Sequence, residues 1–565
     1  MILGLLCMIV ANAAVLLGTQ AILTSLRVAE PCLRIVAFLL LRLLLISLAV
    51  LTLGFCGFLH PVVIGALGVV ALIVLLANGW HRRIRLPRLP DVHPVLGVFL
   101  ALVLARLLAQ AWFFAPYPGD ALSYHLPKVA EWVRAQGFTR EMGLDTHVAF
   151  PAGFELIEMW WVVFLRHDVV IELAGIEFLF LGFVSVYATA RRLDLNENLS
   201  AFAAVVYCLT PGLYFQATAC VNDAPVAALY VATIALAVGN ASWATWLLPI
   251  GLGIGIKATY AYACGGIVLL GFLSRREQRP YSTRVDWLLS GLSLAVGFSW
   301  WVRNLVWFGN PIHPVGTRGL AGANPIQFGP KTDSLFGNVG DLVENRLYDA
   351  ATAYGPYVSD ISGWGAAVFS CGLLALTVAL REDPRIRRLG AAFFVSLIVT
   401  LALVIRDPWS MRFVLFFSAL PAIAMAHLGS TSRTIFFAGS LGVALTFVGT
   451  LLPKELPRDV FHEVARQDWR DRSLAKLLQV DVSSDSIGYY VDSRNIAYLL
   501  YRPDFSRRVV YLRAKTADEF LRQVQKEQLR LVYAAPSKPE QYELLKECVA
   551  RGRLRKLQGF IYAVE

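Results

Sequence analysis

The stretch PVLGVFLALVLARLLAQAWFFAPYPGDALSYHLPK (residues 94–128) joins an apolar segment to a polar one that holds a carboxylate. A membrane-spanning helix needs about 20 predominantly apolar residues, and residues 94–115 meet that requirement. Asp120 is the first acidic residue after Asp91, and it stands where the chain leaves the predicted span. The stretch therefore predicts a helical membrane protein with a polar loop after this span. It leaves open whether Asp120 is plain loop surface or a functional group.

The composition of the whole chain points the same way. Of the 565 residues, 57% are hydrophobic and only 16% are charged, whereas soluble domains carry about 25% charged residues. Apolar runs recur from the first residue to residue 452, which predicts an α-helical polytopic membrane protein. About 14 transmembrane helices are expected, at 1–24, 34–58, 61–80, 94–115, 168–190, 199–214, 223–239, 243–257, 258–273, 286–308, 362–380, 388–405, 411–428 and 433–452.

The net charge of +11 raises the question of nucleic-acid binding. Much of the excess lies in short loops between apolar runs, so the bias of Lys and Arg toward cytoplasmic loops explains it better. We expect no nucleic-acid partner. Alternation across the membrane puts five basic loops on one side, the cytoplasmic one, at 27–34, 81–88, 191–198, 275–284 and 381–388.

The opposite, extracytoplasmic side then receives the loops 116–167 and 308–361 and everything after residue 452. FELIEMWWVVF (154–164) is too short to span, and it predicts an interfacial helix with Trp160 and Trp161 at headgroup level. Residues 453–565 alternate short strands with amphipathic helices, which predicts a small α/β domain. The strands are IGYYVDS, RRVVYL, LRLVYAA and GFIYAVE, and the helices are TADEFLRQVQKEQ and PEQYELLKECVARGR. Residues 1–452 form the predicted transmembrane domain.

Charged groups in or beside a membrane are costly, so each is a functional candidate. Those that map to the extracytoplasmic side lie at five places: Asp120, Asp223, Lys257, Arg303, and the short turn with Arg406, Asp407 and Arg412. Each also has a structural explanation: the acids as loop surface or helix caps, the cations as interfacial anchors. Together, however, carboxylates and cations on one face suit attack by a hydroxyl on a phosphate-linked centre. A carboxylate accepts the proton while Lys or Arg stabilises the departing phosphate.

These residues lie in motifs that resemble GT-C glycosyltransferases, in the branch of the protein O-mannosyltransferases and lipid A aminoarabinose transferases. The similarity covers about residues 94–450. It is carried by PYPGDALSYHLPKVAEWVRAQGF, FPAGFELIEMWW, VNDAP, GIGIKATYA, RNLVWFGNPIHP and SMRFVLFFSALP. Two departures stand out: three spans precede the loop-bearing helix where the family usually has one, and a single Asp followed by YHLP replaces a tandem acidic pair.

The resemblance implies a polyprenyl-phosphate-linked sugar donor and a lipid, glycan or protein acceptor. It makes Asp120 the catalytic base and Asp223 the second acidic residue, which orients acceptor or cations. Lys257, with Arg303 or Arg412, meets the donor phosphate. The other candidates for substrate contact are Tyr124 and His125, which shape the loop.

The expected activity is transfer of a hexosyl or pentosyl group with inversion, at the outer face of the inner (plasma) membrane. No cofactor and no metal ligand set is predicted, and a divalent metal is left open. Two alternatives remain: a transporter or flippase of a lipid-linked or anionic substrate, and a glycan ligase or oligosaccharyltransferase.

Overall fold

A computed structural model of the protein shows a body formed by long apolar helices. The structure describes residues 2–26, 28, 30–83, 92–113, 116, 118–140, 146–273, 281–316, 324–325, 336–340, 363–365, 367–404, 410–451, 485–491, 497–502, 504–536 and 538–565. Most of the predicted outer loop 308–361 and residues 453–484 of the predicted C-terminal domain lie outside these ranges. The division between the two domains at residue 452 therefore stays a prediction.

Each predicted span overlaps helix in the described part of the chain. The helices of the first half are α1 (Ile2–Leu23), α2 (Pro31–Cys56), α3 (Pro61–Ala77), α4 (Pro94–Phe113), α5 (Leu126–Ala135), α6 (Gly153–Val163), α7 (Leu173–Arg192), α8 (Glu197–Cys208), α9 (Pro211–Gln216) and α10 (Asp223–Val238). Those that follow are α11 (Trp243–Ile256), α12 (Tyr260–Leu273), α13 (Arg284–Phe308), α15 (Leu373–Glu382), α16 (Pro384–Leu403), α17 (Ala419–Gly429) and α18 (Arg433–Leu451). Short turns of helix stand between them at η1 (Trp80–Arg83), η2 (Ala121–His125), η3 (Thr146–Ala149), η4 (Asp168–Val170), η6 (Ala367–Gly372) and η7 (Ser410–Ser418).

Seven helical segments among the described residues are long and apolar enough to cross a membrane. They are Ile2–Leu23, Pro31–Cys56, Pro94–Trp112, Asp168–Arg192, Arg284–Phe308, Pro384–Leu403 and Met411–Gly429. Five more apolar helices are shorter, because breaks such as the one between α11 and α12 interrupt long apolar runs. The protein is thus a multi-pass membrane protein, while the number of crossings stays a prediction.

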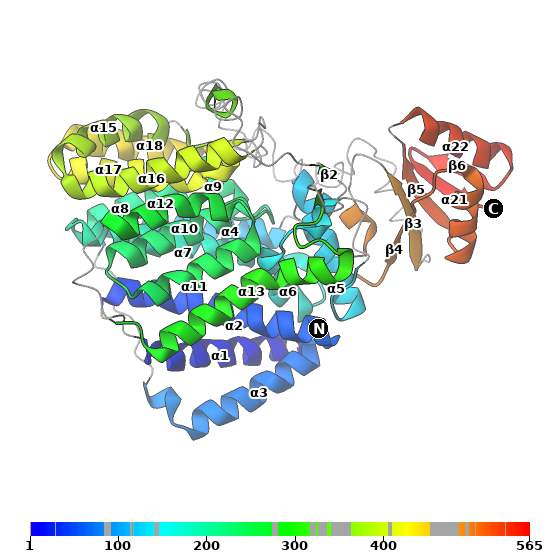
Figure 1. The fold of residues 1–565 in the computed structure, drawn as a ribbon, viewed down its shortest axis with the longest axis horizontal. Helices are drawn as coiled ribbons and strands as arrows, with labels where there is room; N and C mark the ends of the chain where they lie inside the picture. The colour runs from blue at the N-terminus through cyan, green and yellow to red at the C-terminus, as the bar shows by residue number, and fades with distance from the viewer. Residues whose placement is uncertain are drawn as a thin grey trace.

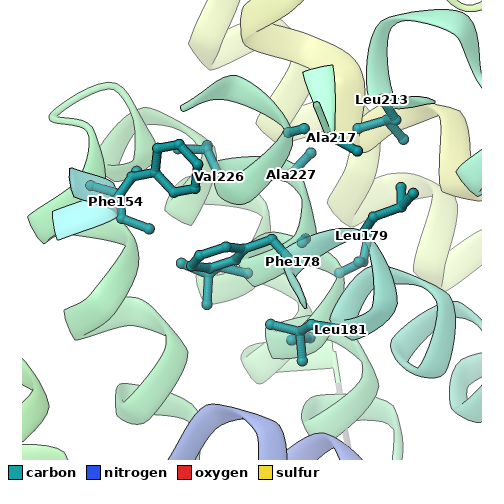
Figure 2. Packing of buried hydrophobic residues seen from close by; sticks show 14 of the residues in the cluster. Phe154, Phe178, Leu179, Leu181, Leu213, Ala217, Val226 and Ala227 are labelled. Carbon is teal, nitrogen blue, oxygen red and sulfur yellow. The ribbon is translucent and has the colours of Figure 1, made fainter. Parts of the chain in front are cut away.

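The centre of the body is a layer of small and branched side chains between α7 and α10. Figure 2 shows Phe178 of α7 below Phe154 of α6 and Val226 of α10, and the rings of Phe154 and Phe178 meet edge to face. The labelled members of this cluster are Phe154, Phe178, Leu179, Leu181, Leu213, Ala217, Val226 and Ala227. Every residue of α10 up to Ala237 is buried, so the helix that begins at Asp223 is held from all sides. A side chain at its first turn therefore has a well-defined position.

The structure corrects the prediction for residues 154–164. This segment does form a short helix, α6, but the helix is buried among α2, α5, α7 and α11. Trp160 is 2% exposed and donates to Asn12 Oδ1, and Trp161 donates to Glu177 Oε1 of α7. An interfacial helix needs one polar face, whereas α6 is apolar around most of its circumference and buries its two glutamates inside the protein.

The C-terminal part contains a five-stranded sheet in the order β4-β3-β5-β7-β6. Its elements are β3 (Ser486–Val491), η8 (Ala497–Leu500), β4 (Arg508–Tyr511), α21 (Ala517–Lys526), β5 (Leu531–Ala535), α22 (Pro539–Ala550), β6 (Leu554–Gln558) and β7 (Ile561–Val564). β3, β4 and β5 are parallel, and β7 and β6 continue the sheet antiparallel. The predicted small α/β fold is confirmed, with β6 as a strand that the sequence pattern did not indicate.

The sheet lies beyond one end of the long helices, on the side of the body where α5 and α6 are found (Figure 1). A two-residue pairing of β1 (Val315–Gly316) with β2 (Asn324–Pro325) follows α13. The turn η2, which follows Asp120, packs on η8 of the C-terminal part and continues into α5 of the helical body, so this segment lies close to both parts of the molecule.

Candidate active site

Asp120 opens a single π-helical turn, η2, which runs directly into α5. Tyr124 lies one turn later and donates its hydroxyl hydrogen to Asp120 Oδ2 at 3.0 Å. Isolated π-turns widen a helix locally and often occur at functional sites. Here the turn brings a tyrosine hydroxyl onto the carboxylate, which remains 30% exposed at its side chain. Asp120 is thus oriented by its own loop and still accessible.

Arg412 reaches Asp120 from a segment almost 300 residues later in the chain. It belongs to η7, and its Nη1 lies 2.6 Å from Asp120 Oδ2. Its Nε lies 4.0 Å from Asp223 Oδ2, so the guanidinium stands between two carboxylates. Although burial works in the opposite direction, the charge of Arg412 holds the pKa of Asp120 below its ordinary range, helped by His125 and the Tyr124 hydrogen bond. Asp120 is therefore ionised at neutral pH.

Asp223 and Lys257 complete the group from two helix ends. Asp223 is the first residue of α10, where a carboxylate also complements the positive end of the helix dipole. Lys257 follows α11 with an extended backbone, and its Nζ lies 2.5 Å from Asp223 Oδ1. Its ammonium also stands 4.6 Å from the ring centre of Phe413, a cation–π contact. We call Asp120, Asp223, Lys257 and Arg412 the open cluster.

Close helix packing fixes the position of Lys257. Gly251 and Gly255 of α11 are four residues apart, as are Ser293 and Gly297 of α13, and such small residues let helix backbones approach each other. A Cβ atom on Gly255 would lie 2.8 Å from the Cα of Gly297, so no larger residue fits there. The glycine pattern before Lys257 therefore serves to bring α11 against α13.

The open cluster retains hydrogen-bonding capacity. Among the described residues Arg412 Nε is buried without a hydrogen-bond partner, and Lys257 has three donor hydrogens of which Asp223 takes one. Two cations with spare donors next to a partly exposed carboxylate can bind an anionic group and accept a proton beside it. This combination suits transfer from a phosphate ester to a hydroxyl.

His125 lies outside the open cluster. It is 2% exposed, and its Nδ1 lies 2.9 Å from Glu155 Oε1 of α6, which also pairs with Lys128. We call His125, Lys128 and Glu155 the buried cluster. Burial lowers the pKa of His125. Burial would raise the pKa of Glu155, but the Lys128 ammonium and the hydrogen bond with His125 outweigh it and lower this pKa to about 2. Such a closed group holds α5 against α6.

Arg303 is also placed away from the open cluster. Its Nη2 donates to the Ala149 carbonyl at 2.6 Å and to Asn304 Oδ1 at 2.7 Å. Asn304 in turn donates to the carbonyl oxygens of Ala149 and His313, both at 3.0 Å. The Arg-Asn pair thus ties the C-terminal end of α13 to the loop before α6.

The structure therefore joins four predicted site residues through direct contacts and adds Tyr124 through its hydrogen bond to Asp120. Sequence reasoning missed Phe413, which adjoins Arg412, and the buried partners Lys128 and Glu155. A lysine three residues after His125 was visible in the quoted stretch, but its partner is 27 residues away and no spacing indicated it. In the described ranges no group of three or more His, Cys, Asp or Glu side chains is arranged to hold a metal ion.

The chain resembles solved structures in its fold. No protein-family model and no curated protein sequence matches the chain. The crystal structure of ArnT from Cupriavidus metallidurans bound to undecaprenyl phosphate is similar, with a TM-score of 0.54 and 12% identity, over 83% of this chain and 98% of that one. The chain has the GT-C fold. A weaker likeness to arabinofuranosyltransferase AftD from Mycobacteria covers 85% of this chain and 40% of that one, at 14% identity and a TM-score of 0.40. The likeness to the ArnT structure confirms the GT-C prediction for the fold.

Proposed function

We propose that the chain is a membrane glycosyltransferase that moves a sugar from a polyprenyl phosphate to an acceptor hydroxyl. The observation that carries the proposal is the open cluster, in which two acids and two cations from four distant segments meet within a GT-C fold. The similar ArnT structure, which is bound to undecaprenyl phosphate, supports a donor of this class.

The donor phosphate is assigned to Lys257 and Arg412. Charge-assisted hydrogen bonds from ammonium and guanidinium groups are the strong way to hold a phosphate, and Arg412 Nε is free of partners among the described residues. The two cations are already balanced by Asp120 and Asp223. An arriving phosphate therefore competes with these carboxylates for the same donors.

This competition gives Asp120 its place in the reaction. Arg412 holds Asp120 as a poor base while the donor is absent. When phosphate takes over part of the guanidinium, the carboxylate is released to accept the proton of the acceptor hydroxyl. The hydroxyl oxygen then forms the new bond to the anomeric carbon with inversion. The bond from that carbon to the phosphate oxygen breaks, and the leaving phosphate keeps the electron pair beside Lys257 and Arg412.

The remaining residues position these groups. Asp223 orients Lys257 and the second edge of Arg412, and Tyr124 orients Asp120. We assign His125 and Arg303 to holding the loop rather than to substrate contact, since both direct their donors to protein groups. We place the cluster and the C-terminal sheet on the extracytoplasmic side of the inner membrane, as the basic loops indicate.

The test is transfer by the full-length protein reconstituted in vesicles with polyprenyl-phosphate sugars. Asp120→Asn keeps a hydrogen-bond acceptor but loses the base, so the transfer rate should fall about 10²–10⁴-fold. The matched control is Asp194→Asn, an exposed acid paired with Arg385 far from the cluster, which should keep the wild-type rate.

Three results would overturn the proposal. Wild-type transfer by Asp120→Asn removes the base assignment. Transfer from diphosphate-linked glycans alone indicates a ligase or oligosaccharyltransferase. Accumulation of labelled solute inside the vesicles, without transfer, indicates a transporter.

A further inference from the structure

The segment between β3 and β4 of the C-terminal sheet lies against the loop that carries Asp120. We propose that this segment, residues 497–502, is a positioning clamp for the candidate base, with the Tyr501 hydroxyl as its key contact. The inference rests on the proposed function, because it assigns the C-terminal sheet a part in the same reaction. Sequence patterns left the role of this sheet open.

Tyr501 donates its hydroxyl hydrogen to Glu131 Oε1 of α5 at 2.6 Å. Both residues are buried, at 7% and 2% exposure, so the bond is shielded from water. The other oxygen of Glu131, Oε2, accepts two hydrogen bonds from Arg134, at 2.7 and 3.0 Å. Tyr511 of β4 lies with its hydroxyl 3.1 Å from that of Tyr501 and links the contact to the sheet. The carboxylate of Glu131 is thus fixed from both sides.

A second tyrosine repeats this arrangement at α7. Tyr498 of η8 donates to Asp168 Oδ2 at 2.7 Å, at the turn that precedes α7. Between the two tyrosines Leu500 is fully buried, and η8 packs directly on η2 as well as on α5. The clamp therefore touches the π-helical turn that starts at Asp120, in addition to the helix that follows it.

One face of the C-terminal sheet packs on the helical body. Alternation along β3 sends Tyr490 toward α21, where its hydroxyl donates to the Ala514 carbonyl. Tyr489 points the opposite way, beside Tyr511 and Tyr533 of the neighbouring strands. The side chains of this second face belong to one continuous hydrophobic core with the helical body. The sheet is therefore docked on the body, and η8 is its contact with the Asp120 loop.

Restraint of this loop matters because Asp120 is partly exposed and stands on a short connecting segment. Loops move more than the elements that they join, and a misplaced base lowers the rate without weakening ground-state binding. η2 and α5 are continuous, so fixing Glu131 and the outer surface of η2 limits how far Asp120 can move. The proposed donor-binding cations Lys257 and Arg412 belong to other segments, so the clamp acts on the position of Asp120 and not directly on theirs.

The test compares Tyr501→Phe with Tyr490→Phe in the full-length protein. Each change removes one buried hydroxyl bond from the same sheet, but only the first bond reaches α5. For Tyr501→Phe we expect a fall in kcat of about 10-fold, as for loss of a hydrogen bond to a charged group, with the donor KM unchanged. Hydrogen exchange of the peptide covering 121–135 should rise in this variant alone. Tyr490→Phe should match the wild type in both measurements.

Two outcomes overturn the clamp: unchanged exchange over 121–135 in Tyr501→Phe, or equal kcat values for the two variants. An increase in donor KM with unchanged kcat also overturns it, since that pattern places the contact in binding. Failure of the proposed function has a different signature. In that case Asp120→Asn transfers sugar at the wild-type rate, while the exchange measurement still reports whether Tyr501 restrains the loop.

Discussion

The open cluster and the buried cluster contain the same kinds of groups, yet they differ in what they can do. Both join carboxylate and cation, and the segment 120–128 contributes to each: Asp120 to the first, His125 and Lys128 to the second. In the buried cluster every side chain is at most 2% exposed. In the open cluster three of four side chains are 17–30% exposed. Identical chemistry thus becomes a candidate site in one place and a structural joint in the other.

The difference between the clusters lies in the accessibility of their side chains. Ion pairs sealed in the interior hold protein elements in place, and removing one partner leaves an uncompensated charge. Ion pairs at the edge of the interior, with donors to spare, can exchange a protein partner for a ligand. A charged residue in a membrane protein can therefore indicate either a structural ion pair or a binding site, and the accessibility of its side chain distinguishes the two.

The largest effect is expected from breaking the buried cluster. Lys128→Met leaves Glu155 without its ammonium partner in a fully buried position. The free energy of unfolding should fall by about 3–5 kcal/mol, which a denaturant titration in detergent would measure. A loss of less than about 1 kcal/mol would mean that this cluster does not act as a structural joint.

The same substitution in the open cluster should act on binding instead. Lys257→Met removes a proposed ligand of the donor phosphate, while Asp223 keeps Arg412 nearby. Affinity for polyprenyl phosphate should fall about 10–100-fold, as for one charge-assisted hydrogen bond. The free energy of unfolding should fall much less than it does in Lys128→Met. Wild-type affinity in a direct binding assay would contradict the assignment of Lys257.

The buried cluster should make the stability of the protein sensitive to acid. Burial keeps His125 neutral in the folded protein, and its folded-state pKa lies below the unfolded value of 6.5. Protonation therefore favours unfolding, and stability present above pH 6.5 is lost as the pH falls below 6.5 toward the folded-state pKa. The slope is at most about 1.4 kcal/mol per pH unit for one proton. His125→Asn should flatten the measured slope, and an unchanged slope would assign the acid sensitivity to other groups.

Much of this organisation was predictable from sequence, because apolar run length and glycine or proline breaks are local properties. The predicted spans overlap helices, and four charged residues chosen for their side of the membrane are linked by direct contacts. The failures share a cause: the environment of a side chain depends on distant segments. Trp160 was expected at a headgroup surface but is buried by α1 and α2. Arg303 was one of two alternatives, with Arg412, for meeting the donor phosphate beside Lys257, and its Nη2 donates to the Ala149 carbonyl. β6 was missed because LRKLQ has few apolar residues, and pairing with β7 supplies its stability.

The smallest effect is expected at the boundary between the clusters. Tyr124 donates to Asp120 from the residue next to His125, so Tyr124→Phe leaves the buried cluster intact and frees the candidate base. Loss of this one bond should lower kcat about 5–10-fold, equivalent to about 1–1.4 kcal/mol. Tyr230→Phe is the matched control, because it removes a hydroxyl bond to Ser396 inside the helical body. It should reduce stability by about 1 kcal/mol while kcat stays at the wild-type value. Equal kcat values in the two variants would show that Asp120 needs no orientation by its own loop, and Arg412 alone would then position the carboxylate.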